Sequence, residues 1–183
     1  MEKKFRWVID QAHSEIGFKV KHLMITNVKG LFKTYQASIY TIGEDFLTAE
    51  IDFWMDPNSI DTHDAKRDQH LRSSDFFEVE KHKEITFKGN TVEKEDQKGA
   101  YELWGDLTIK GITKRIRLDV EMEGLATDPG GARKAGFLIT GKINRKDWDI
   151  NWNAALETGG VLVSDTIMIN CEVQLIKDKE IVA

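Results

Sequence analysis

The side chains best suited to chemistry in this chain lie between positions 64 and 73, where arginine, aspartate and histidine follow one another closely. A guanidinium group offers planar pairs of N–H donors that match a phosphate or a carboxylate, and a lipid head group needs only a few such donors. We therefore expect basic residues of this segment and of other parts of the chain to bind a polar head group. The candidate donors are His22, Arg67, Arg72 and Arg145.

The same segment also has a plainer interpretation as a solvated helix. Residues 64–73 form the only helix that the sequence predicts, with Asp61 or Thr62 as its N-cap. The aspartates of this helix would stand three or four positions from its arginines, a spacing that allows salt bridges along one face. Head-group binding and a salt-bridged helix that covers the mouth of the fold remain open as alternatives.

Catalytic and metal-binding motifs are missing from the sequence. His63 and His70 are seven positions apart and lack the His-x-x-x-His spacing that places two imidazoles on one helical face, so no metal site is predicted. Ser14 lies outside any Gly-x-Ser-x-Gly elbow, and no glycine-rich phosphate loop is present. We therefore predict no catalytic residue and no required cofactor. The alternative is an enzyme, an isomerase or hydrolase of a lipophilic substrate, with Arg67, Asp68 or His70 as its polar groups.

The charge and hydropathy of the chain exclude several classes of partner. Its 183 residues include 31 acidic and 26 basic side chains, which give a formal charge of −5, and the two signs are mixed along the sequence. Nucleic-acid binding needs a clustered basic surface, so no such partner is predicted. No apolar run is long enough to span a membrane, and the apolar stretch near the N-terminus is too short for a signal peptide. The expected location is the cytoplasm, unless a leader was removed. The single cysteine, Cys171, is expected to be a small buried hydrophobe.

Apolar and polar side chains alternate over most of the chain, which is the pattern of strands with one buried face. Ile116, Leu118 and Val120, for example, alternate with charged neighbours. We count eight or nine strands. Turns are predicted at residues 43–45, 98–99, 110–111, 128–131 and 158–160. One short helix cannot cover so much sheet, so we predict that the strands close into an extended antiparallel, eight-stranded, lipocalin-like barrel, a single domain over residues 1–183.

Such a barrel is expected to enclose an apolar ligand. Several predicted strands reach about ten residues, longer than usual, and eight strands leave an interior just wide enough for side chains or one small ligand. In a barrel, the inward aromatic and aliphatic side chains are at once core and ligand wall. The predicted lining residues are Phe18, Val20, Phe32, Ile51, Phe53, Phe76, Phe77, Phe87, Leu103, Leu107, Leu118, Phe137, Ile139 and Ile169.

Two tryptophans do not follow the inward pattern. Trp54 and Trp104 are out of phase with the apolar residues next to them, so both are expected to point away from the interior. Tryptophans on the outer wall are consistent with a partner surface. We hypothesise a homodimer on this basis.

A series of short motifs in one order resembles a known family. Residues 66–77 (KRDQHLRSSDFF) and 105–114 (GDLTIKGITK) carry most of the likeness, and the segments at 7–14, 18–22, 136–137, 140–145 and 152–153 extend it over nearly the whole chain. The chain thus resembles the YceI-like family of bacterial polyisoprenoid-binding proteins. The resemblance implies a lipocalin-like barrel, frequently dimeric, that holds an isoprenoid or a similar long-chain amphiphile without established catalysis. The sequence departs from the family pattern at Lys83, where a proline is usual, and at Asp149, where a glycine is common.

Overall fold

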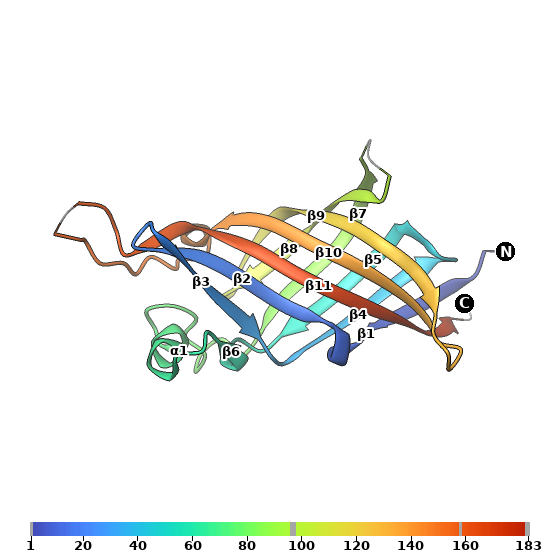
Figure 1. Cartoon of the computed structure of the whole chain (residues 1–183), viewed down its shortest axis with the longest axis horizontal. Coiled ribbons are helices and arrows are strands. Elements are labelled where there is room, and N and C mark those ends of the chain that lie inside the picture. Colours follow the sequence, from blue (N-terminus) through green and yellow to red (C-terminus); the bar gives the residue numbers. More distant parts are fainter. Residues whose placement is uncertain (1, 96–97, 158, 182–183) are drawn as a thin grey trace.

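The computed structural model describes residues 2–95, 98–157 and 159–181, and in this part of the chain it is built mainly of antiparallel strands (Figure 1). The strands are β1 (Lys4–Ile9), β2 (Glu15–His22), β3 (Thr26–Phe32), β4 (Tyr35–Ile42), β5 (Asp45–Met55), β6 (Ile60–Asp61), β7 (Ile85–Lys94), β8 (Ala100–Ile109), β9 (Ile112–Thr127), β10 (Arg133–Asn144) and β11 (Val163–Ile181). The helices are α1 (Ala65–Arg72) and the short 3-10 turns η1 (Gln11–His13), η2 (Pro57–Ser59) and η3 (Arg145–Trp148).

Eight of these strands close into a barrel. Neighbouring strands pair in the order β1-β4-β5-β7-β8-β9-β10-β11, and β11 then pairs with β1 from Leu175 opposite Ile9 to Ile181 opposite Lys4. The fold class predicted from the sequence is therefore confirmed. The predicted number of eight or nine strands was too low for the described residues, because β2, β3 and the two-residue β6 lie outside the closed ring.

The barrel is extended at one end because β11 is long enough to pair with two different strands along the same edge. Its C-terminal part pairs with β1, and its N-terminal part, from Val163 to Glu172, pairs with β2. The sheet then continues through β3 to β6, beside α1. Figure 1 shows α1 and β6 near one end of the molecule, while both termini lie at the other end. We call the end with α1 the mouth and the end with the termini the closed end.

The alternation of the sequence explains the strand faces, and turn residues explain the connections. On β9, Ile116 and Leu118 are buried, whereas their neighbours Arg115 and Arg117 are exposed. Lys110 and Gly111 join β8 to β9 with φ angles of 52° and 73°, the two left-handed residues of a tight hairpin whose twist matches the strands. The predicted turns at 43–45, 98–99 and 128–131 also join consecutive strands, and Thr158 of the last predicted turn lies outside the described residues.

The helix forms where the sequence predicts it, but its cap is different. Neither Asp61 nor Thr62 caps α1, because the Asp64 carboxylate accepts a hydrogen bond from the Arg67 N–H at 3.0 Å and is itself the N-cap. The Thr62 hydroxyl is engaged by the buried carboxylate of Asp68. None of the helices in the described ranges has the length and hydropathy of a membrane-spanning segment.

Aromatic side chains plug the closed end of the barrel. Trp7 is fully buried, and its indole N–H donates to the Thr41 hydroxyl at 2.9 Å. The Phe46 ring lies 5.0 Å from that of Trp7 and 4.9 Å from that of Phe137, distances typical of tilted and edge-to-face packing. This cluster fills the barrel beneath β1 and leaves access to the interior at the mouth.

Candidate functional site

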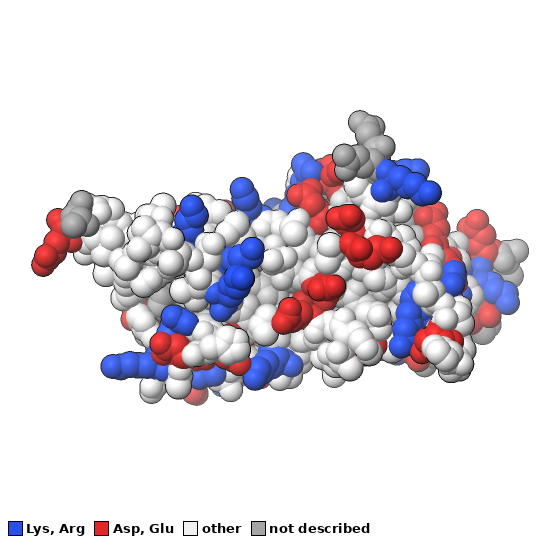
Figure 2. Space-filling model, viewed as in Figure 1, with Lys and Arg blue, Asp and Glu red and all other residues white. Residues whose placement is uncertain are grey.

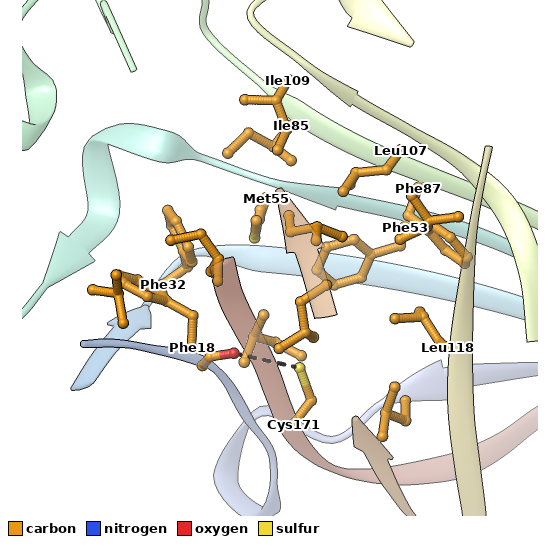
Figure 3. A pocket seen from close by; sticks show the side chains of 18 of the residues that line it. Phe18, Phe32, Phe53, Met55, Ile85, Phe87, Leu107, Ile109, Leu118 and Cys171 are labelled. Atoms are coloured by element: carbon orange, nitrogen blue, oxygen red, sulfur yellow. Dashed lines mark hydrogen bonds between the residues drawn. The ribbon is translucent and has the colours of Figure 1, made fainter. Parts of the chain in front are cut away.

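A cavity of about 890 Å³ occupies the barrel interior between the aromatic plug and α1. In Figure 3, Phe18 of β2, Phe53 and Met55 of β5, Phe87 of β7 and Leu118 of β9 converge on one shared space. Every lining residue predicted from the apolar pattern borders this cavity. These residues are Phe18, Val20, Phe32, Ile51, Phe53, Phe76, Phe77, Phe87, Leu103, Leu107, Leu118, Phe137, Ile139 and Ile169.

Several inward side chains of the cavity wall are left without protein contacts on one side. Ile51, Phe53, Ile139 and Ile169 face the interior and pack on the core, yet they are only half-buried. A close-packed core would cover such residues completely. Their remaining surface faces the cavity, so the barrel holds apolar space that its own side chains do not fill.

Two phenylalanines shape the wall by lying over glycines. A Cβ atom added at Gly30 would stand 2.3 Å from Cζ of Phe18, and one added at Gly105 would stand 2.4 Å from Cζ of Phe87. Each glycine therefore leaves the space that a neighbouring ring needs. The rings cover backbone that would otherwise face the cavity, so the wall remains apolar at these positions.

Charged side chains border the cavity only at the mouth, as far as the described residues show. They come from the end of β2, from the segment around α1 and from η3. The cavity is therefore amphipathic along its length, with an apolar shaft and a polar opening. The polar residues of this opening are Lys21, His22, Asp64, Lys66, Arg67, His70 and Arg145.

Arg145 borders the cavity, but most of its donors serve the backbone. Its side chain is 3% exposed, and Nη1 donates to the carbonyl oxygens of Ile150 at 2.9 Å and Trp152 at 2.7 Å. Nε donates to the carbonyl of Ser164 at 3.0 Å, and burial lowers the pKa of the guanidinium. Arg145 therefore fastens η3 and the segment after it to the start of β11.

Arg72 does not border the cavity, so its role as a head-group donor stays a prediction. Its Nε donates to the Asn58 carbonyl at 3.0 Å and its Nη2 to the Ile60 carbonyl at 3.1 Å. These bonds hold α1 against η2 and β6. The sequence missed this role because the acceptors are backbone oxygens, which leave no trace in residue type.

Arg67 borders the mouth and is partly engaged. Its Nε donates to the Thr62 hydroxyl at 2.8 Å and its Nη2 to the Thr62 carbonyl at 2.6 Å. Asp68 accepts the Thr62 N–H at 2.9 Å, so no ion pair joins the aspartates and arginines of α1 in the described chain. The salt-bridged helix expected as the plainer interpretation is therefore wrong. The Nη1 group of Arg67 and the Lys66 ammonium have no partner among the described residues, so they are available donors of α1 that border the cavity.

An aromatic cluster lies beside these donors. The His70 ring packs edge-to-face on Phe76 at 5.0 Å and on Trp152 at 4.6 Å, and its Nε2 lies 2.8 Å from the Asp75 carboxylate. Trp148 is also fully buried and borders the cavity, and its indole N–H donates a hydrogen bond to the Leu107 carbonyl. The lining prediction omitted both tryptophans because they lie in irregular segments, where no period marks an inward face.

The departure from the family pattern at Asp149 has a visible backbone effect. Asp149 adopts a left-handed φ of 58° directly after η3, a conformation that favours glycine and that aspartate tolerates better than most residues. The chain therefore keeps the turn without the glycine. Lys83, the other departure, is exposed before β7 and lies away from the cavity.

The free cysteine is buried in the wall, as predicted. Cys171 borders the cavity, and its Sγ lies 4.0 Å from the Gly17 carbonyl oxygen (Figure 3). Burial raises the pKa of the thiol to about 11. At neutral pH the group is an apolar thiol, because the thiolate would have to form without water around it.

The outward tryptophans do not form one patch. Trp54 and Trp104 are half-buried and absent from the cavity wall, as predicted. Trp54 pairs with Thr86 and Trp104 with Thr91, so their backbones are offset by about 16 Å along β7 and lie on opposite sides of that strand, about 10 Å apart across the sheet. The homodimer inferred from them stays a prediction.

An eight-stranded antiparallel barrel with an apolar interior and a polar mouth defines a lipocalin-like fold. The family model of the YceI-like domain matches residues 7–175, and this chain belongs to that family. A UPF0312 protein of Staphylococcus epidermidis is 42% identical over 159 residues, which cover 86% of this chain and 90% of that protein.

Two solved structures are similar over nearly the whole chain. The crystal structure of a Campylobacter jejuni YceI protein matches with a TM-score of 0.73 and 36% identity, covering 93% of this chain and 96% of the other. A polyisoprenoid binding domain from Saccharophagus degradans matches with a TM-score of 0.66 and 13% identity, covering 95% and 99%. At such low identity the second likeness shows the fold alone.

Proposed function

We propose that this protein binds a polyisoprenoid, or a similar long-chain amphiphilic lipid, in its barrel and sequesters or carries it. The observation that carries the proposal is the unfilled apolar cavity of about 890 Å³. Its volume falls within the range of about 300 to 1,000 Å³ that is typical of small-molecule sites. The half-buried aliphatic and aromatic side chains of the wall would complete their packing on an apolar chain.

The arrangement of charge favours a ligand with one polar end. A lipid tail in the shaft loses its contact with water, which contributes about 0.8 kcal/mol for each CH₂ group. The head group would lie at the mouth, within reach of Lys21, His22, Lys66 and the unengaged Nη1 of Arg67. Noncovalent affinity rarely exceeds about 18 to 21 kcal/mol, so a long tail would already approach that ceiling and release would be slow.

The known relatives support this class of ligand. The chain belongs to the YceI-like family, and a structural neighbour is described as a polyisoprenoid binding domain. The fold that the two share is the same closed barrel, which here encloses the apolar cavity. The cytoplasmic location and the homodimer stay predictions, and the solution mass at micromolar concentration would decide the second.

The contacts at the mouth favour binding over the alternative of an enzyme that acts on a lipophilic substrate. Asp68 accepts hydrogen bonds from the N–H and hydroxyl of Thr62, and it is buried. His70 is bonded to Asp75, and Arg67 uses two of its nitrogens on Thr62. A general acid or base needs a free position toward the substrate. Each group uses one or two atoms to hold α1 in place, and the nearest thiol on the cavity wall, Cys171, is not ionised at neutral pH because burial raises its pKa to about 11.

A substitution that fills the cavity tests the proposal. Ile139→Trp places a larger ring in the shaft, and we expect it to weaken binding of farnesol and geranylgeraniol at least tenfold, because the ring occupies the tail's volume. Thr140→Trp is the matched control, since Thr140 is the next residue on β10 and is exposed on the outer wall. Binding is measured by displacement of a fluorescent apolar probe, and near-ultraviolet circular dichroism checks the fold.

Two outcomes would contradict the proposal. Wild-type protein that takes up no isoprenoid alcohol of any length would remove the ligand class. Equal binding by the wild type and the two folded variants would place the ligand outside the shaft.

A further inference from the structure

Exposed apolar side chains gather at the mouth, at the turn between β2 and β3. Among the described residues, five large hydrophobic side chains are exposed, and four of them lie here: Leu23, Met24, Ile25 and Val161. Ile25 is 78% and Met24 54% exposed, and the Leu23 N–H donates to the Leu162 carbonyl at 3.0 Å, which joins the turn to the segment that holds Val161. We call these four residues the apolar tip.

The backbone of the turn is unusual for the residues that it carries. Leu23 and Met24 have φ angles of 54° and 60°, and the Ile25 N–H donates to the His22 carbonyl at 3.2 Å. A turn with positive φ at two successive residues is normally built from asparagine and glycine, because larger side chains are strained at positive φ. The chain thus places bulky apolar side chains in solvent at a position where small polar ones would be more stable. An observed strain of this kind is typical of functional positions.

Lysines lie on the outer wall next to the apolar tip. Lys19 and Lys29 face each other directly across β2 and β3. Met168 pairs with Lys19 on one side and with Lys142 on the other, so the three lysines form one row across the wall. The described residues offer no ion pair to any of them. Like charges opposite each other are unfavourable within a sheet, and an external anion would relieve the repulsion.

The charge on this wall changes sign along the barrel. Figure 2 shows lysine and arginine over the half toward the mouth and aspartate and glutamate toward the middle. Glu15 pairs with Glu172, four residues beyond the Lys19–Met168 pair and further from the mouth. At the mouth itself, the Asp61 carboxylate is bonded to Lys33 at 3.0 Å, and Glu157 is exposed in the neighbouring loop. On the outer wall beside the apolar tip, the row that β2, β3 and β10 contribute is therefore positively charged.

We propose that the apolar tip and the lysine row dock the mouth onto a bilayer that carries anionic lipid. The apolar tip would enter the boundary between head groups and acyl chains, and the lysines would contact the head-group phosphates. Lys21, His22, Leu162 and Val163 adjoin the tip and border the cavity, so docking would open the shaft toward the membrane. This inference rests on the proposed function, because a protein that carries a lipid must exchange that lipid with a bilayer.

Vesicle sedimentation tests the docking surface. The probes are vesicles of phosphatidylcholine alone and vesicles that also contain phosphatidylglycerol, mixed with the whole protein. We expect the wild type to bind the anionic vesicles, with affinity that falls as salt rises. Met24→Glu with Ile25→Glu should lower binding more than tenfold. Lys29→Glu with Lys142→Glu should lower it by about fivefold or more for each lysine, because the charge at each site is reversed.

Matched controls come from the closed end. Leu47 is the fifth exposed hydrophobic residue, and Lys3 is an exposed lysine paired with Glu180 at 3.3 Å. Leu47→Glu and Lys3→Glu should leave vesicle binding unchanged. Circular dichroism establishes that every variant is folded. Wild-type binding that is equal on both kinds of vesicle, or that survives the substitutions at the tip, would overturn the proposal.

A second readout separates docking from ligand binding. Farnesol binding in solution, without vesicles, should be the same in the wild type and in both docking variants, because none of the four substituted residues borders the cavity. Vesicle binding without farnesol binding would leave docking standing and refute the lipid-binding function. If the wild type ignores vesicles, and the tip variant changes a dimer into a monomer in light scattering, the tip is a contact between copies and the membrane proposal is wrong.

Discussion

The arginines of the mouth show how the same side chain can serve a ligand or the fold. A guanidinium group was expected to bind a head group, yet Arg72 and Arg145 donate to backbone carbonyls. These carbonyls belong to η2, to the first residue of β6, to the segment after η3 and to the start of β11, where the pairing with β2 is irregular. The irregular mouth is therefore held in shape by side chains whose planar donors replace ladder hydrogen bonds.

Replacement of Arg145 by lysine should destabilise the protein. A lysine ammonium cannot reach the carbonyls of Ser164, Ile150 and Trp152 together, so at least one carbonyl would be left unsatisfied. We expect Arg145→Lys to lower the free energy of unfolding by about 2 to 4 kcal/mol in urea denaturation. Lys146→Arg, at the exposed neighbouring position, is the control. Equal stability of the wild type and Arg145→Lys would show that the hydrogen bonds of the buried Arg145 guanidinium are dispensable.

The thiol of Cys171 should react slowly in the native protein. With its pKa at about 11, only about one thiol in a thousand is ionised at pH 8, against about a quarter for an unperturbed cysteine. Maleimide should therefore label the native protein at least about a hundredfold more slowly than the urea-unfolded protein, with a rate that still rises with pH above 9. Bound lipid should slow labelling further, because Cys171 borders the cavity. Native labelling at the unfolded rate would mean that the thiol is exposed.

Among the elements, β11 decides the shape of the barrel. Because it pairs with β1 near its C-terminus and with β2 near its N-terminus, the wall is closed at one end and flared at the other. Ion pairs also stabilise the closed end. Glu44, between β4 and β5, accepts hydrogen bonds from Arg133 of β10 at 3.0 Å and from Lys177 of β11 at 3.1 Å. This cluster joins strands that the ladder does not pair directly.

Glu44 should make the stability of the closed end depend on pH. The hydrogen bonds from Arg133, and the charges of Arg133 and Lys177, hold the pKa of Glu44 below its ordinary value of 4.5, although burial opposes them. Its contribution is therefore complete above pH 4.5 and is lost as the pH falls through the lowered pKa. Glu44→Gln should reduce the free energy of unfolding by about 0.5 to 1 kcal/mol at pH 7, since the pair is partly exposed, and by less below pH 4.

The exposed pair between Glu50 and Lys4, 3.9 Å apart, supplies the control for that measurement. Glu50→Gln should leave stability unchanged at every pH, because exposed ion pairs contribute little. A Glu44→Gln variant that loses equal stability at pH 7 and at pH 3 would refute the electrostatic role of Glu44.

For the whole molecule, the sequence predicted the barrel and its wall because period-two alternation directly encodes which side chains face inward. Ile116 and Leu118 of β9 and the predicted phenylalanines of the strands lie where that period places them, whereas Phe76 and Phe77 border the cavity from outside the strands. The mouth could not be predicted in the same way. Trp148 and Trp152 lie outside regular strands. The arginines there donate to backbone carbonyl oxygens, which every residue type has, so the sequence does not mark these acceptors. The cap of α1 was missed because Thr62 and Asp61, suited to capping by type, have other partners.

The barrel therefore combines a rigid, plugged end with an apolar shaft and a mouth that carries charge. We propose that the shaft holds a long-chain lipid, which would occupy the cavity of about 890 Å³. The most direct measurement is organic extraction of gently purified protein, followed by mass spectrometry of the extract. Protein stripped by heat and refolded is the control.

We predict a stoichiometric isoprenoid or similar long-chain amphiphile in the native extract, its absence from the stripped sample, and its return when a polyprenol is added to the refolded protein. A blank extract from folded protein, together with no uptake of added polyprenol, would contradict the account.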